Sequence, residues 1–109
     1  MINSKIKQAL SDKAFSGDIL LPQDADYDTC RAVWNAMIDK RPALIAQCRT
    51  PKDVVAAVKV AAAQDLAIAV RAGGHNVAGH AVCDGGMLID LRQMNKVSID
   101  SERKTASVE

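Results

Sequence analysis

Residues 43–80 read ALIAQCRTPKDVVAAVKVAAAQDLAIAVRAGGHNVAGH, and the order of the central elements follows from this run. The short apolar segment at residues 43–48 predicts a strand. Thr50 and Pro51 then predict a helix start, because threonine caps free backbone N–H groups and proline suits the first helical position. A second apolar segment, at residues 66–70, predicts a strand that is buried on both faces. A glycine-rich loop follows it.

Further strands are expected on the C-terminal side of this unit. Residues 87–91 predict one strand, and residues 97–99 and 105–108 predict a hairpin around the polar residues 100–104. The expected fold class is therefore α+β, with N-terminal helices, a strand-helix-strand unit and a small mixed sheet. The last strand reaches Glu109, and the open edge of such a strand leaves backbone groups free for pairing.

The N-terminal side has a different character. Residues 1–40 predict a mostly helical leader, with a short first helix around residues 5–10, an extended piece at 18–21 and a second helix over residues 26–37. The chain is accordingly divided into this leader and an α+β unit at residues 41–109. The apolar residues expected on one side of the second helix are Val33, Trp34, Met37 and Ile38.

The composition is that of an ordinary soluble domain of 109 residues. Fourteen Lys and Arg face thirteen Asp and Glu, so the net charge of +1 offers no electrostatic case for nucleic acid or an anionic membrane. No apolar run is long enough to span a bilayer. The polar start of the chain does not resemble a secretory signal, so a cytoplasmic location is expected by default.

Cysteine and histidine usage argues against a metal site. The three cysteines are odd in number and none is two residues from another, which argues against a disulfide framework or a thiolate zinc site. We interpret them as small buried hydrophobic residues. His75, His80 and Cys83 are of types that suit zinc, but the fourth ligand would have to be Asp84 or a distant group. We therefore predict no metal.

The loop after residue 70 carries the chemical signal. Glycine permits positive φ and close approach of another group, and Gly73, Gly74 and Gly79 fall within seven positions. Successive amides in such a turn form a concave anion site. Arg71 is expected to add a positive charge at its mouth. From the residues alone two interpretations stay open, a phosphate cradle and a turn that only connects two strands.

Two better-known phosphate loops do not fit. The dinucleotide fingerprint requires G-x-G-x-x-G at the start of a helix, whereas the first glycines here are adjacent and poor helix formers follow. The nucleotide-triphosphate loop requires Lys and Ser or Thr after its second glycine. Gly74 and Gly79 have the correct spacing for that loop, but His80 and Ala81 replace the required residues.

At these residues the sequence resembles the FAD-linked oxidases of the berberine-bridge-enzyme-like group, in the vanillyl-alcohol-oxidase superfamily with its PCMH-type FAD-binding domain. The match runs in order through residues 41–45, 50–58, 70–76 and 83–91, and it covers nearly the whole chain. The R-x-G-G-H pattern at residues 71–75 is much more specific than a lone pair of glycines.

The resemblance implies that residues 41–109 are the first subdomain of a two-part FAD-binding domain, truncated at its C-terminal end. It implies that backbone amides of residues 72–76 hold the FAD diphosphate and that His75 is bonded to the flavin 8α carbon. The cofactor-binding residues expected on this basis are Arg71, Ala72, Gly73, Gly74, His75, Asn76, Gly79 and His80.

The implied activity is hydride transfer from a substrate C–H bond to the flavin, with reoxidation by oxygen or another acceptor. The second subdomain, the catalytic base and the substrate domain cannot be located, so no catalytic residue is assigned. A small-molecule substrate is expected only of a longer parent protein, and this chain alone is expected to be inactive. Two alternatives stay open. One is a module that grips a nucleotide diphosphate weakly or pairs with a partner; the other is a fragment that binds no flavin and forms a homo-oligomer through its open sheet edge.

Overall fold

The computed structural model describes residues 2–109 and has an α+β architecture, as expected. The helices are α1 (Ile2–Asp12), α2 (Tyr27–Arg31) and α3 (Pro51–Ala63). The strands are β1 (Asp18–Leu20), β2 (Leu44–Gln47), β3 (Ile68–Arg71), β4 (Met87–Asp90), β5 (Val97–Asp100) and β6 (Thr105–Val108).

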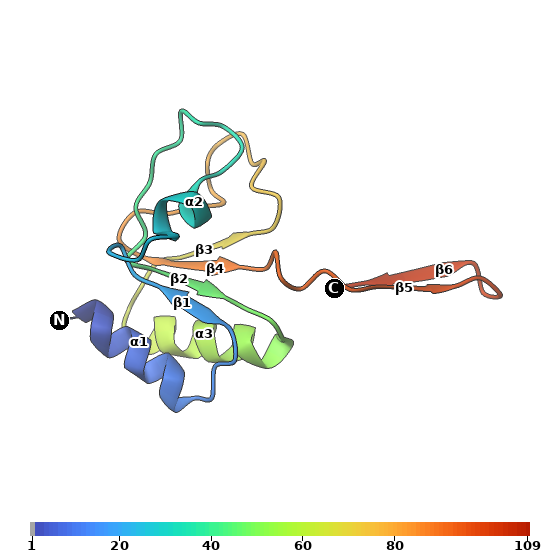
Figure 1. Ribbon diagram of the computed structural model, residues 1–109, viewed down its shortest axis with the longest axis horizontal. Helices are drawn as coiled ribbons and strands as arrows, with labels where there is room; N and C mark the ends of the chain where they lie inside the picture. Colours follow the sequence, from blue (N-terminus) through green and yellow to red (C-terminus); the bar gives the residue numbers. More distant parts are fainter. Residues whose placement is uncertain (1) are drawn as a thin grey trace.

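Four strands form a mixed sheet in the order β1-β2-β4-β3. Strands β2 and β3 both pair with β4 in parallel, and β1 pairs with β2 antiparallel. Helix α3 connects β2 to β3 and lies with α1 on one face of the sheet, while α2 and the long loops lie on the other (Figure 1). The carboxyl ends of the three parallel strands therefore meet at one edge.

The sheet separates two hydrophobic clusters, and strand β4 contributes to both because successive side chains point to opposite faces. Met87 and Ile89 pack with the α1 and α3 side chains, whereas Leu88 packs with Tyr27 and Val82 on the opposite face. All five side chains are at most 2% exposed. Strand β4 is thus the buried centre of the fold.

The predicted N-terminal cap of α3 is confirmed. The Thr50 side chain accepts a hydrogen bond from the Asp53 amide, and Pro51 is the first helical residue. The first strand of the leader is also confirmed, and its pairing with β2 places Ile19 beside Ala46. Strand β1 therefore joins the N-terminal leader to the sheet formed by the residues after 40.

The prediction of a second helix over residues 26–37 is wrong beyond Arg31. Ala32 has φ −64° and ψ 135°, an extended conformation that ends α2. Trp34 and Met37 are 77% and 89% exposed, so their spacing does not mark a core-facing helical side. The Trp34 amide donates to the Gly74 carbonyl at 3.0 Å, and such contacts with a distant loop replace helical hydrogen bonds.

The prediction that the strand before the loop is buried on both faces is also wrong. Strand β3 lies at the edge of the sheet, and its residues alternate between exposed and buried. Ile68 and Val70 are 40% and 52% exposed, while Ala69 and Arg71 are buried. The reason is topological, because β4 takes the central position that the apolar run suggested for β3.

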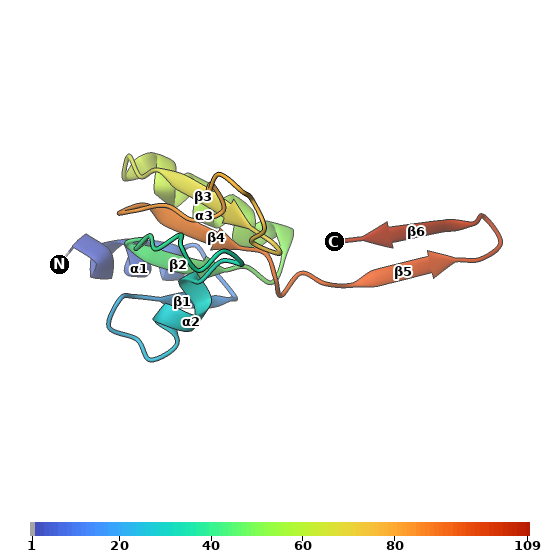
Figure 2. The same ribbon diagram turned by 90° about the horizontal axis from the view of Figure 1, so that it is seen from above.

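The predicted hairpin is present, but it forms its own two-stranded sheet of β5 and β6 outside the main mixed sheet. It projects away from the body in both views (Figures 1 and 2). Val97 lies opposite Val108 and Ile99 opposite Ala106, so one face of the hairpin is apolar. Val97, Ile99 and Val108 are all more than 60% exposed.

Candidate functional site

The glycine loop starts where β3 ends, at the edge where the parallel strands have their carboxyl ends. Ligands of sheets with parallel strands bind outside this edge. The loop continues to the start of β4 at Met87, and Gly74 and Gly79 both have positive φ, at 72° and 80°. The fold therefore presents the loop where a ligand can reach it.

The first half of the loop carries a row of free backbone donors. The amides of Gly73, Gly74, His75 and Asn76 donate to no acceptor in residues 2–109. Gly74 is a buried residue, and a buried amide without an acceptor costs free energy unless a ligand or water accepts its hydrogen. An oxyanion such as a diphosphate supplies the acceptors that this row lacks. The loop therefore fits a diphosphate group.

The second half of the loop is closed internally. The Asn76 side-chain oxygen accepts from the His80 amide at 3.0 Å, and the Asn76 carbonyl accepts from the Gly79 amide at 3.1 Å. The Lys40 ammonium donates to the Gly79 carbonyl at 3.1 Å. Gly79 and His80 thus lie in a turn whose amides are already bonded, while residues 73–76 keep theirs free.

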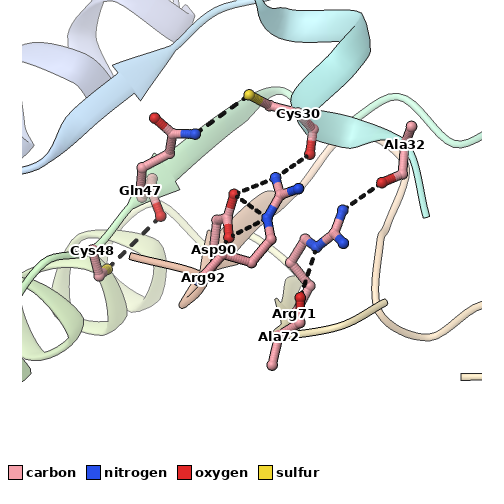
Figure 3. A network of polar contacts seen from close by, with 9 residues as sticks. Cys30, Ala32, Gln47, Cys48, Arg71, Ala72, Asp90 and Arg92 are labelled. Atoms are coloured by element: carbon pink, nitrogen blue, oxygen red, sulfur yellow. Dashed lines mark hydrogen bonds and ion pairs between the residues drawn. The ribbon is translucent and has the colours of Figure 1, made fainter. Parts of the chain in front are cut away.

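Arg71 does not lie at the mouth of the loop, which corrects the sequence-based prediction. It is 5% exposed, and its guanidinium runs beneath the loop and donates to the carbonyls of Ala32 and Ala72 (Figure 3). An added Cβ at Gly74 would lie 2.6 Å from Arg71 Nη2. Burial, with help from the charge of Arg92, lowers the Arg71 pKa from its ordinary value. Its charge therefore acts on the loop from below.

Asp90 and Arg92 form an ion pair at the same sheet edge, which sequence reasoning missed. Asp90 ends β4 and is 1% exposed, and Arg92 Nη2 lies 2.6 Å from its carboxylate (Figure 3). Burial raises the Asp90 pKa, but hydrogen bonds from Arg92 outweigh burial, and the net pKa is lowered. Arg92 also donates to the Cys30 carbonyl at 3.0 Å and so ties α2 to this edge. The sequence does contain a signal for this ion pair, because the acidic Asp90 directly follows the apolar residues 87–89.

His75 is exposed and its imidazole stacks on the Trp34 indole, with centroids 4.8 Å apart and planes 15° apart. No group that the structure describes forms a hydrogen bond with the imidazole. His80 is also exposed, but no aromatic stack involves it among the described residues. The structure therefore brings one free imidazole beside the row of free amides.

The cysteines do not assemble with these histidines. In the described part of the chain, no group of three or more His, Cys, Asp or Glu could hold a metal ion. Burial raises the pKa of the Cys83 thiol, and it raises that of Cys48 to about 12. Of the three cysteines only Cys48 is fully buried, while Cys30 and Cys83 are half-buried. None of the helices within residues 2–109 is long and apolar enough to cross a membrane.

Comparison with known proteins defines the class. The family described as FAD binding domain matches residues 42–109, and the chain belongs to this family. It is 37% identical over 107 residues to (R)-6-hydroxynicotine oxidase of Paenarthrobacter nicotinovorans, a match that covers 98% of the chain and 23% of that relative. The expected resemblance to berberine-bridge-enzyme-like FAD-linked oxidases is confirmed.

Solved structures agree with this assignment. The structure of 6-hydroxy-D-nicotine oxidase from Arthrobacter nicotinovorans matches with a TM-score of 0.85 at 38% identity, over 88% of the chain and 21% of that structure. A structure of glucooligosaccharide oxidase from Acremonium strictum, described by its 6-S-cysteinyl, 8α-N1-histidyl FAD, matches with a TM-score of 0.84 at 26% identity. The match covers 94% of the chain and 22% of that structure. The chain spans only 11% to 23% of the curated relatives it matches.

Proposed function

We propose that this chain holds the diphosphate of FAD in residues 72–76 and attaches the flavin covalently through His75. The parent activity proposed with it is hydride transfer from a small-molecule C–H bond to the flavin, with oxygen or another acceptor taking the electrons. The observation that carries the proposal is the row of free amides at residues 73–76 with an unbonded imidazole in the same row.

The diphosphate role follows from the charges and donors of the loop. The N–H groups of Gly73 and Gly74 donate to no acceptor in the described residues, and a glycine has no side chain of its own to obstruct a phosphate oxygen. The buried guanidinium of Arg71 lies below Gly74 and adds positive charge without occupying the binding face. The amides and Arg71 would act on the diphosphate in different ways. The amides would donate hydrogen bonds to it directly, whereas Arg71 would act through its positive charge and by supporting the loop conformation.

The attachment role follows from the state of His75. No hydrogen bond within the described residues involves its ring nitrogens, and a solved structure whose description names a histidyl FAD shares the fold of this region. When bound, the flavin supplies its 8α methyl carbon, and bond formation with the imidazole releases two protons and two electrons that reduce the ring until oxygen or another acceptor removes them. His75 thus needs only an accessible nitrogen held near that carbon.

The experiment incubates the chain with FAD in air and follows yellow colour in the acid-precipitated protein. Wild type is expected to keep flavin in the pellet. His75→Ala is expected to lose the covalent flavin and to retain part of the non-covalent binding, whereas His80→Ala, in the same loop, is expected to behave as wild type. Covalent flavin on His75→Ala would refute the attachment site, and a colourless protein with a melting temperature indifferent to FAD would refute flavin binding.

A second function has one observation in its favour. The hairpin projects from the body (Figure 2) and has an exposed apolar face of Val97, Ile99, Ala106 and Val108. Exposed apolar sheet surface and an open strand edge favour association of copies. The alternative is therefore a homo-oligomer formed through the hairpin, with no flavin bound.

A further inference from the structure

Trp34 is a large aromatic side chain that lies exposed beside the loop. It is 77% exposed, so burial in the core does not explain its position. Its indole ring instead lies parallel to the His75 imidazole, at 4.8 Å between centroids and 15° between planes. Its backbone amide donates to the Gly74 carbonyl, one residue before His75, at 3.0 Å. The residue is therefore fastened to the loop by both its backbone and its ring.

The segment that carries Trp34 is braced against the loop at several points. Before Trp34, the Ala32 carbonyl accepts a hydrogen bond from the buried Arg71. After it, Lys40 Nζ donates to the Gly79 carbonyl at 3.1 Å. An added Cβ at Gly79 would lie 2.9 Å from the Ile38 side chain, which shows how closely the segment packs on the second turn of the loop. Contacts on both sides of Trp34 thus hold residues 32–40 against the loop and limit the movement of the indole.

The stack restricts the imidazole in a useful way. His75 has no hydrogen bond among the described residues, so the indole is the contact that orients its ring. The indole covers one face of the imidazole, and the two nitrogens lie on the ring edge, which a parallel stack leaves open. Rotation of the imidazole out of plane would break the stack. Holding a reacting group in one orientation raises its rate of reaction with a bound partner.

We propose that Trp34 is a positioning residue for His75, which holds the imidazole in the orientation in which a ring nitrogen meets the flavin. This inference rests on the proposed attachment of flavin to His75. Aromatic stacks of this kind contribute a small free energy. Loss of the stack is therefore expected to slow attachment roughly three- to tenfold, without abolishing it.

The test measures the rate of covalent FAD incorporation by the whole chain, as flavin retained after acid precipitation over time. Trp34→Leu, which keeps an apolar side chain without a flat ring, is expected to be about three- to tenfold slower than wild type. Trp34→Phe, which keeps an aromatic face, is expected to recover most of the rate. Met37→Leu is the matched control, since Met37 is 89% exposed on the same segment and is expected to leave the rate unchanged.

A second readout needs no flavin. Trp34 is the single tryptophan of the sequence, so the intrinsic fluorescence reports directly on the stack. His75→Ala is expected to change the Trp34 emission because it removes the ring stacked on the indole, while His80→Ala is expected to leave it unchanged. Equal emission in the two variants would show that the stack does not form and would overturn the inference.

The outcomes separate this inference from the proposed function. Attachment to wild type with an unchanged rate in Trp34→Leu would overturn the positioning role and leave His75 as the attachment residue. Absence of attachment to wild type would refute the proposed function, and the positioning role would fall with it. A slow Trp34→Leu whose melting temperature equals that of wild type, with recovery in Trp34→Phe, would support positioning over a merely structural role.

Discussion

Replacing Gly74 by alanine tests how the loop is supported from below. Gly74 has φ +72°, and its added Cβ would lie 2.6 Å from Arg71 Nη2 and 3.1 Å from Arg71 Cζ. Left-handed backbone costs a non-glycine residue roughly 1–2 kcal/mol. The guanidinium must also move away from the Ala32 carbonyl, and a hydrogen bond from a charged group contributes about 1.5–3 kcal/mol. The expected total is a loss of about 2.5–5 kcal/mol of unfolding free energy.

Gly85→Ala is the matched control for this prediction. Gly85 has φ +68°, close to that of Gly74, but an added Cβ there meets nothing within 4 Å. Gly85→Ala is therefore expected to cost only the backbone term, roughly 1–2 kcal/mol. The difference between the two variants isolates the contact with Arg71.

The assay is urea denaturation of both variants and wild type, followed by circular dichroism at pH 7. The midpoint should fall further for Gly74→Ala than for Gly85→Ala, with the same dependence on urea concentration. Equal losses in the two variants would refute the claim that Arg71 supports the loop. In an Arg71→Ala background, Gly74→Ala should cost no more than the backbone term, and a larger loss there would point to a different contact.

Acidification and the hairpin give two further predictions. Asp53 accepts hydrogen bonds from the Ser16 amide at 2.8 Å and the Ser16 hydroxyl at 2.7 Å. Burial raises the Asp53 pKa, but hydrogen bonds to its carboxylate outweigh burial, and the net pKa is lowered. The ionised carboxylate therefore stabilises the fold fully above the unfolded-state pKa of about 3.9. This stabilisation is lost as the pH falls through the lower pKa of Asp53 in the folded protein. In urea titrations from pH 7 to pH 2, Asp53→Asn should lose about 1–3 kcal/mol of unfolding free energy at pH 7, and its unfolding free energy should decline less steeply below about pH 4. Asp12→Asn, at an exposed position, should keep the wild-type dependence on pH. An unchanged dependence in Asp53→Asn would contradict the stabilising role of the Asp53 carboxylate. Sedimentation should show less self-association for Ile99→Lys, on the apolar hairpin face, than for Ser98→Lys on the other face. Equal association of these two variants would exclude that face as the contact.

Local signals in the sequence were sufficient for several features. The Thr50-Pro51 helix start, the hairpin at residues 97–108 and the glycine loop each depend on residues close together in the chain, and the structure confirms all three elements. The resemblance carried by residues 71–75 led to the correct family because an R-x-G-G-H pattern after a strand is a local arrangement. Capping, turn geometry and hairpin pairing are short-range effects, so a single sequence carries them.

Tertiary structure alone decided how Arg71, His75 and Trp34 lie around the glycine loop. Ala32 is extended, and residues 33–38 form bends and a turn instead of a helix. Distant groups of the loop bond the backbone here, since the Ala32 carbonyl accepts from Arg71 and the Trp34 amide donates to the Gly74 carbonyl. Arg71, at the end of the edge strand β3, is buried and donates to the Ala32 carbonyl, and Trp34 stacks on His75. These contacts join residues about 40 positions apart in the chain. Spacing along the sequence cannot predict them, because they depend on how the strands and loops are arranged in space.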